Sequence, residues 1–205
     1  MEMTHSSMII LQKSLRQIKE NLCQIKEAKC TLFGLNNWPE FHKTWTAVRT
    51  KFIDDLIEKH AGSGQIQQIV NLGAGMDTRP YRLNCYSAFS QGSFAVDMAI
   101  VNTSKAKVFA DFLNSPSPHC AGVHNLDLDF LSEDESLKSV LGSSEAYDMP
   151  KPSIFIAEGL IMYLGAAGKM KLLRDISEVA APGSILILNF IEDVENNSPG
   201  ALSTA

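Results

Sequence analysis

Short apolar runs alternate with amphipathic stretches over most of this chain. The segment 66–72 is a short, mainly apolar run followed by Gly-Ala-Gly at 73–75, which is typical of a buried strand with a tight turn after it. Similar runs predict strands at 93–96, 119–128, 153–157 and 184–190. Apolar residues at helical spacing between these runs predict helices at 99–113, 133–141 and 166–180. Strands that alternate with helices predict an α/β fold with a parallel, doubly wound sheet.

The first part of the chain predicts two helices ahead of the sheet. Apolar residues in 8–29 recur at spacings of three and four and share one helix face: Leu11, Leu15, Ile18, Leu22 and Ile25. A second helix is predicted at 41–60, after the break at Trp38-Pro39. We therefore divide the chain into an N-terminal helical extension, residues 1–62, and an α/β core, residues 63–205.

Composition and charge narrow the class of protein. Hydrophobic residues make up 45% of the chain and charged residues 20%, which is ordinary for a globular protein. The net charge of −5 offers no basic face of the kind that nucleic acids need, so we expect no nucleic-acid partner. No apolar run approaches the roughly 20 residues that span a bilayer, so we expect no membrane segment.

The cysteines show no spacing typical of a metal or redox site. Cys23, Cys30, Cys85 and Cys120 include no C-x-x-C pair and no Cys/His cluster with zinc-ligand spacing. We expect no metal site, and reduced, mostly buried thiols in a cytoplasmic protein. The oligomeric state stays open.

A glycine turn follows the first strand of the predicted sheet. Gly73 and Gly75 can adopt unusual φ values and let a ligand approach the backbone closely. Taken alone, the turn could equally be a plain strand-to-helix connection. A dinucleotide fingerprint would place a third glycine at position 78, where this chain has Thr78, which makes NAD or FAD less favoured.

Two acidic residues end further strands at the edge where open α/β sheets bind ligands. Asp97 follows the second strand, about 20 residues past the glycine turn, where a carboxylate binds ribose hydroxyls in nucleotide-binding sheets. It could instead cap the helix predicted at 99–113. Glu158 follows the fourth strand and could face an ammonium group, or be a solvated loop carboxylate. We favour ribose binding for Asp97 because the glycine turn precedes it.

Three segments carry a family resemblance. They are VNLGAGMDTR at 70–79, continued by YRL at 81–83; IAEGLIMYL at 156–164; and VRTKFIDD at 48–55. In the order in which they occur along the chain, within about 41–190, they resemble the signatures of the leucine carboxyl methyltransferase family. The resemblance implies a Rossmann-like S-adenosylmethionine-dependent methyltransferase sheet with N-terminal helices. It also implies S-adenosyl-L-methionine as the cofactor.

The resemblance also implies cofactor-binding roles for individual residues. Arg49 would pair with the methionine carboxylate of the cofactor, since a guanidinium fork suits a carboxylate. Gly73 and Gly75 would let the backbone meet the cofactor. Asp97 would hold the ribose, and Glu158 would lie near the methionine end.

Further roles follow from the same resemblance. Asp127 and Leu128 resemble an Asp-Leu pair that flanks the adenine, with Asp129 close enough to leave that register open. Tyr163 would face the transferred methyl group and is the candidate catalytic residue.

The resemblance implies an O-methyltransferase whose acceptor stays open. The acceptor could be a protein C-terminal carboxylate, a small-molecule acid or hydroxyl, or a modified tRNA base. A carboxylate, with a pKa of about 3.5, is ionised at pH 7 and needs no general base. Catalysis would then rest on orientation and on removing water. For a hydroxyl acceptor, His119 and His124 are candidate bases by residue type alone.

The C-terminal sequence departs from the family pattern. Such sheets continue past the fifth strand with a helix and an antiparallel strand pair, whereas here a short polar sequence follows Phe190. We predict that the last two strands are missing and that 184–190 is an exposed apolar edge. Either the chain is a fragment of a longer product, or a partner covers that edge.

Three functions therefore remain. The first is an active S-adenosylmethionine-dependent O-methyltransferase. The second is a truncated, inactive relative that binds the cofactor without catalysis. The third is a nicotinamide-dependent oxidoreductase, which Thr78 and the family signatures disfavour.

Overall fold

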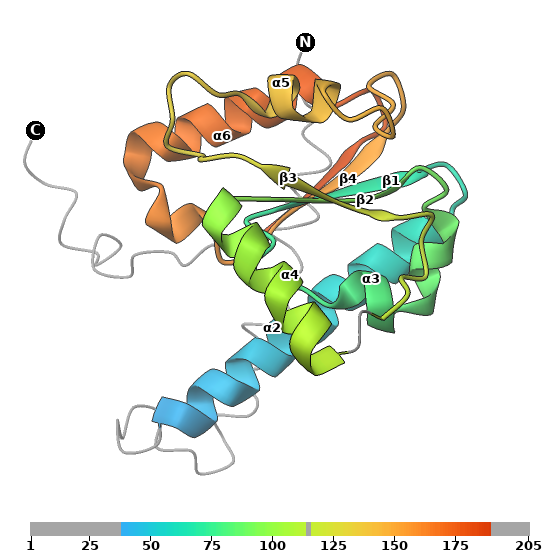
Figure 1. The fold of residues 1–205 in the computed structure, drawn as a ribbon, viewed down its shortest axis with the longest axis vertical. Helices are drawn as coiled ribbons and strands as arrows, with labels where there is room; N and C mark the ends of the chain where they lie inside the picture. Colours follow the sequence, from blue (N-terminus) through green and yellow to red (C-terminus); the bar gives the residue numbers. More distant parts are fainter. Residues whose placement is uncertain (1–37, 114–115, 190–205) are drawn as a thin grey trace, which may run out of the picture.

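The strands of the structure form one parallel sheet. The computed structural model describes residues 38–113 and 116–189. Within them the strand order is β3-β2-β1-β4-β5, and each neighbouring pair is parallel. The strands are β1 (Gln68–Leu72), β2 (Gly92–Asp97), β3 (Val123–Asp127), β4 (Ser153–Ala157) and β5 (Ile185–Leu188). The predicted α/β fold with a parallel, doubly wound sheet is confirmed (Figure 1).

Helices cover both faces of this sheet. The α-helices described are α2 (Trp38–Ala61), α3 (Arg79–Arg82), α4 (Ala99–Leu113), α5 (Leu137–Gly142) and α6 (Gly165–Val179). Figure 1 shows α5 and α6 on one face and α2, α3 and α4 on the other. Helix α3 and the 3₁₀ helices η2 (Asn84–Ala88) and η3 (Ile161–Tyr163) are too short for apolar spacing to predict.

Alternate residues of the central strands point to opposite faces and build two hydrophobic layers. Val70 of β1 is fully buried in the layer that contains Leu172 of α6. Ile69, its neighbour in sequence, is fully buried in the layer that contains Ile57 of α2. Because both faces of β1 are covered, only the ends of the strands are left to contact a ligand.

Helix α2 begins at Trp38 rather than at the predicted residue 41. Pro39 therefore lies in the first turn, where its missing N–H costs no helical hydrogen bond. The other end of the helix buries Ile53, Ile57 and Ala61 in the hydrophobic layer shared with the sheet. The division of the chain at residue 62 stays a prediction.

Strand β3 and helix α5 both begin later than the sequence predicts. The backbone N–H of His119 donates to the carbonyl of Pro80 and that of Ala121 to the carbonyl of Phe89, outside the sheet ladder, and the strand begins only at Val123. Helix α5 begins at Leu137 instead of residue 133 because Ser136 caps it. The Ser136 hydroxyl accepts from the backbone N–H of Ser139 at 3.1 Å, and this capping bond sets the first turn.

Two predictions fall outside the described residues, namely the helix at 8–29 and the missing strands after residue 189. Within the described sheet, β3 and β5 are the edge strands. No helix in residues 38–113 and 116–189 is long and apolar enough to cross a membrane.

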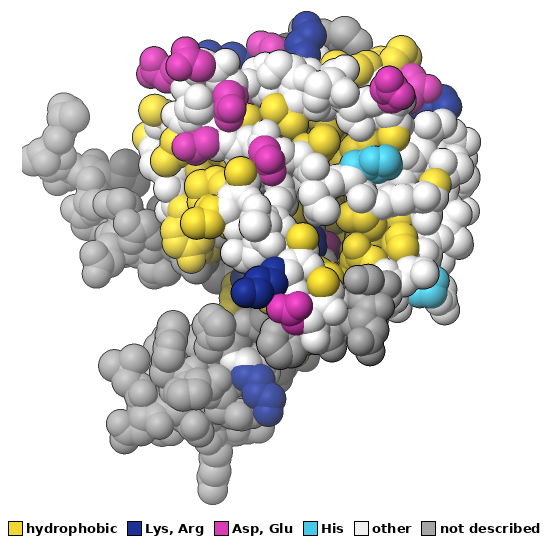
Figure 2. Space-filling view, in the orientation of Figure 1, with side chains coloured by type: hydrophobic (Ala, Val, Ile, Leu, Met, Phe, Trp, Pro, Cys, Tyr) yellow, Lys and Arg dark blue, Asp and Glu magenta, His cyan; other side chains and the backbone are white. Residues whose placement is uncertain are grey.

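The surface in Figure 2 carries a mixture of charges. Acidic side chains gather in the upper part of the view, over the region of α5 and α6. Lys and Arg side chains are scattered, so this face is not a continuous basic surface.

Candidate functional site

The carboxyl ends of three strands meet at one edge of the sheet. Leu72, the last residue of β1, lies opposite Val96 of β2 and Ala157 of β4. The segments that start at Gly73, Asp97 and Glu158 therefore leave the sheet side by side. Strand β1 has β2 on one side and β4 on the other, so this edge is the topological switch point at which open α/β sheets bind ligands.

The turn after β1 depends on its glycines. Gly73 has φ of 67° and Gly75 has φ of 47°, in the left-handed region that favours glycine. The N–H of Gly73 donates to the carbonyl of Val96 at 2.8 Å, which draws the turn over the end of β2. A Cβ atom on Gly73 would lie 3.0 Å from Cδ1 of Leu160. Both the backbone conformation and the close packing therefore require glycine at position 73.

The Asp97 carboxylate is bound to this turn. Its Oδ2 accepts from the backbone N–H of Gly75 at 2.8 Å, and its Oδ1 accepts from the N–H of Met98 at 2.8 Å. Asp97 is buried at the end of β2. A carboxylate has further acceptor positions on both oxygens, so these bonds leave capacity for ribose hydroxyls. The ribose role of Asp97 stays a prediction.

A polar cavity of about 370 Å³ opens at this edge. Its lining includes four residues that the sequence singled out, namely Arg49, Gly73, Gly75 and Glu158. The remaining lining residues are Thr50, Asn71, Ala74, Met76, Asp77, Thr78, Arg79 and Arg82. Asp97 is not one of the lining residues, but it is bonded to the lining residue Gly75.

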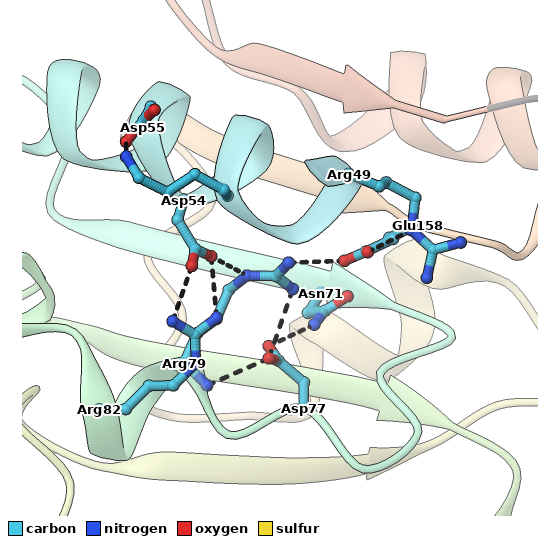
Figure 3. Close-up of polar contacts among 9 residues, drawn as sticks. Arg49, Asp54, Asp55, Asn71, Asp77, Arg79, Arg82 and Glu158 are labelled. Carbon is cyan, nitrogen blue, oxygen red and sulfur yellow. Dashed lines mark hydrogen bonds and ion pairs between the residues drawn. The ribbon is translucent and has the colours of Figure 1, made fainter. Parts of the chain in front are cut away.

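Arg79 joins three segments beneath the cavity (Figure 3). Its Nε lies 2.7 Å from Oδ1 of Asp54 on α2, and its Nη2 lies 2.7 Å from Oε2 of Glu158 after β4. Its Nη1 lies 3.3 Å from Oδ1 of Asp77 in the glycine turn. Arg82 adds a second guanidinium to Asp54, at 2.7 Å from Oδ2. The ion pairs thus connect α2, the glycine turn and the end of β4.

The charge of Arg79 is stabilised although its side chain is buried. Burial by itself lowers the pKa of a guanidinium. The carboxylates of Asp77, Glu158 and Asp54 outweigh that effect and raise the pKa of Arg79 above its usual range. The guanidinium of Arg79 is therefore a permanent cation in the folded chain.

Arg49 and Glu158 form an ion pair at the side of the cavity. Nε of Arg49 lies 2.7 Å from Oε1 of Glu158. Figure 3 shows the other two nitrogens of this guanidinium pointing away from Glu158. Glu158, expected near an ammonium group of the cofactor, is held by two guanidinium groups in this structure. Its role toward a ligand stays a prediction.

The end of β3 lies beside the end of β2. Asp127 is paired with Asp97 across the sheet, and the backbone N–H of Leu128 donates to the carbonyl of Asp97 at 3.0 Å. Nδ2 of Asn102 donates to Oδ1 of Asp127 at 2.8 Å. Asp129 lies further on, where its Oδ1 accepts from the N–H of Leu131. Asp127 is therefore the closer of the two carboxylates to Asp97, and its adenine role stays a prediction.

The candidate catalytic residue and the candidate bases do not line the cavity. Tyr163 lies on η3 and is 76% exposed. His119 is exposed in the loop before β3 and donates its backbone N–H to the carbonyl of Pro80. The His124 ring stacks on Phe94, with ring centroids 5.0 Å apart. Of these residues, only Tyr163 follows the carboxyl end of a strand, and its role stays a prediction.

A model of one protein family matches most of this chain. The family is described as leucine carboxyl methyltransferase, and the match covers residues 12–177. The chain belongs to the leucine carboxyl methyltransferase family. The resemblance inferred from the three sequence segments is thereby confirmed.

Two curated relatives of this methyltransferase family member carry the cofactor in their names. A protein of Mycobacterium marinum, named as an S-adenosyl-L-methionine-dependent methyltransferase, is 36% identical over 138 residues. A similarly named protein of a Parafrankia species is 33% identical over 153 residues. The matches cover 67% and 73% of this chain, but 43% and 45% of the relatives. The chain thus spans less than half the length of the curated relatives it matches.

A solved structure shares the fold of this chain. A DUF574 family protein of Streptomyces avermitilis superposes with a TM-score of 0.51 and 17% identity. The superposition covers 68% of this chain and 52% of the other. At this identity the likeness concerns the fold alone, and it agrees with a Rossmann-like α/β sheet.

The sequence did not single out Asp54, Asn71, Asp77, Arg79 or Arg82, although all stand within or beside the three family segments. The available signal was the set of charged residues Asp77, Arg79 and Arg82, which follows shortly after a buried strand. Their partners lie on other elements and could not be read from the same segment. In the part of the chain that the structure describes, no group of three or more His, Cys, Asp or Glu residues is placed to hold a metal ion.

Proposed function

We propose that this chain binds S-adenosylmethionine in the cavity at the ends of β1, β2 and β4 and transfers its methyl group to an oxygen atom. One observation carries the proposal. The glycine turn is bonded to Asp97 and faces the same cavity as the Arg49–Glu158 pair. We assign the glycine turn and Asp97 to the ribose of the cofactor, and Arg49 to its amino-acid carboxylate.

The residues present fit this cofactor. Gly73 and Gly75 present backbone without side chains to the cavity, so a nucleoside can lie close to them. Asp97 supports the turn from behind and has acceptor positions for ribose hydroxyls. Arg49 binds Glu158 through Nε, and its other two guanidinium nitrogens can donate a pair of hydrogen bonds to a ligand carboxylate.

S-adenosylmethionine supplies a sulfonium-activated methyl group, so the residues of the chain need to bind, orient and exclude water. We infer a carboxylate acceptor because neither His119 nor His124 lines the cavity. A carboxylate, with a pKa of about 3.5, is already the nucleophile at pH 7. The proposed acceptor class is a small-molecule acid or a protein C-terminal carboxylate, in agreement with the family description.

Isothermal titration calorimetry with S-adenosylhomocysteine tests cofactor binding. We expect the wild-type chain to bind it and to give no heat with NADH. Arg49→Gln should weaken binding by about 1.5–3 kcal/mol, the scale of hydrogen bonds to charged groups. Arg174→Gln, which changes an exposed arginine on α6, is the matched control and should bind as the wild type does. Binding of NADH in place of S-adenosylhomocysteine would overturn the proposal.

Methyl transfer is tested separately with labelled S-adenosylmethionine. The acceptors are small carboxylic acids and a peptide ending in a free leucine carboxylate, with the same peptide amidated as the control. We expect label on the free carboxylates and none on the amide. Cofactor binding without transfer to any of them would favour a protein that binds S-adenosylmethionine without catalysis.

A further inference from the structure

We propose that Arg79 is a positioning residue that holds Glu158, and through it Arg49, in place for the amino-acid end of the cofactor. The inference rests on the proposed function. It concerns a side chain that the sequence did not single out and that acts through its neighbours.

Arg79 is placed to hold Glu158 rigidly. Its side chain is 4% exposed and contacts carboxylates from three separate segments. Asp54 comes from α2, Asp77 from the glycine turn and Glu158 from the end of β4. A planar guanidinium with fixed donor directions can hold all three at once, which a lysine ammonium cannot do in the same geometry.

Glu158 in turn holds Arg49 in position, because the Glu158 carboxylate bridges the guanidinium groups of both arginines. Oε2 lies 2.7 Å from Nη2 of Arg79, and Oε1 lies 2.7 Å from Nε of Arg49 (Figure 3). The two arginines differ in exposure, since the Arg49 side chain is 25% exposed and that of Arg79 is 4% exposed. The inner guanidinium is therefore fixed, and the outer one faces the cavity with nitrogens available for a ligand.

The charges of the cluster explain why Arg79 should affect the ligand. The cationic side chains are Arg49, Arg79 and Arg82, and the anionic ones are Asp54, Asp77 and Glu158. Without Arg79, Asp54 would still form an ion pair with Arg82, whereas Glu158 would form an ion pair with Arg49 alone. Glu158 would then lose the contact that fixes its orientation, and Arg49, which Glu158 holds, would no longer be positioned for the ligand carboxylate.

The affinities for two ligands distinguish a positioning role of Arg79 from a role in the stability of the fold alone. S-adenosylhomocysteine carries the amino-acid end, and 5′-methylthioadenosine lacks it. For Arg79→Lys we expect the affinity for S-adenosylhomocysteine to fall about tenfold or more, the scale of hydrogen bonds to a charged group. The affinity for 5′-methylthioadenosine should stay near that of the wild type. Arg174→Lys, which changes an exposed arginine on α6 away from the cavity, is the matched control and should leave both affinities nearly unchanged.

A second variant keeps the test decisive if Arg79→Lys does not fold, which circular dichroism reports. Glu158→Gln retains Arg79 and weakens the bridge to Arg49, so it should produce the same selective loss. Equal losses for both ligands, or no loss for either, would overturn the role of Arg79. A wild-type chain that does not bind S-adenosylhomocysteine counts instead against the proposed function.

Discussion

The carboxylate of Asp97 and the backbone amide of Gly75 are joined by a hydrogen bond of 2.8 Å between Oδ2 and N. This bond connects the end of β2 with the turn after β1, so each segment holds the other in position. It also explains why an acidic residue and a glycine turn at this spacing belong to one site. The turn presents backbone to the cavity, and Asp97 supports it from the interior of the sheet.

Replacing Asp97 should weaken cofactor binding. We expect Asp97→Ala to reduce the affinity for S-adenosylhomocysteine by about 1–3 kcal/mol, because the charge-assisted bond to the turn is lost together with the acceptor proposed for the ribose hydroxyls. Calorimetric titration measures the change. Asp111→Ala, at an exposed position of α4, is the control and should bind normally. An unchanged affinity of Asp97→Ala would reject its role at the site.

Replacing Gly73 should destabilise the fold. Gly73→Ala places a side chain at φ of 67° and a Cβ atom 3.0 Å from Leu160, so we expect a loss of about 1–3 kcal/mol in the free energy of unfolding. Urea unfolding measures it. Gly142→Ala is the matched control, because a Cβ atom at that position would meet open space, and its change should stay within about 1 kcal/mol. Equal stability of the two variants would contradict the strain at Gly73.

Asn102 connects the ends of β2 and β3. Its Nδ2 donates to Oδ1 of Asp127 at 2.8 Å and to the carbonyl of Leu126 at 3.1 Å. We expect Asn102→Asp to lower the free energy of unfolding by more than the roughly 1–3 kcal/mol typical of a buried unpaired group, since it puts a second anion beside Asp127. Chemical unfolding of Asn102→Asp and Asn102→Ala tests this order, with Asn84→Asp at an exposed position as the control. A milder effect for Asn102→Asp would contradict the expectation.

Lys105 should make stability depend on pH. It is buried on α4, with Nζ 5.9 Å from the ring centroid of Phe109. Burial lowers the pKa of Lys105 below its usual 10.5, although Asp77 and Asp97 oppose that shift. Between the lowered folded pKa and 10.5 the unfolded state binds more protons, so the contribution of Lys105 to stability rises with pH.

The comparison of wild type with Lys105→Met isolates this effect. The wild type should gain stability relative to the variant as pH rises through that window, as measured by urea unfolding from neutral to alkaline pH. Lys107→Met, at an exposed position of the same helix, should show no such trend. A wild-type-minus-Lys105→Met difference that stays constant with pH would count against a lowered pKa.

The order of elements could be predicted because it depends on local patterns. The strand of 66–72 is an apolar run before a glycine turn, and β1 is found at Gln68–Leu72. The sequence also predicted that Gly73, Asp97 and Glu158 lie at one edge of the sheet. The reason is that the carboxyl ends of parallel strands meet at the same edge. The starts of β3 and α5 were predicted too early, because the residues just before Val123 bond to Pro80 and Phe89 outside the ladder and because Ser136 caps α5.

The ion pairs beneath the cavity could not be predicted in this way. Arg79 and Asp54 are 25 positions apart and lie on different elements, and Glu158 comes from a third. Their contact depends on how α2 crosses the sheet, which follows from the packing of Ile53 and Ile57 on the strands. The spacing of residues within one segment does not predict how a helix crosses a sheet.

The sequence by itself determined the class of fold, the family and the edge of the sheet that carries the glycine turn, because periodicity and motifs are properties of neighbouring residues. Only the tertiary structure decided that Asp97 bonds to Gly75 and that Glu158 lies between Arg49 and Arg79. The reason is geometric. Directed contacts between charged groups from distant segments exist only after the hydrophobic layers have fixed the strands and α2 in place.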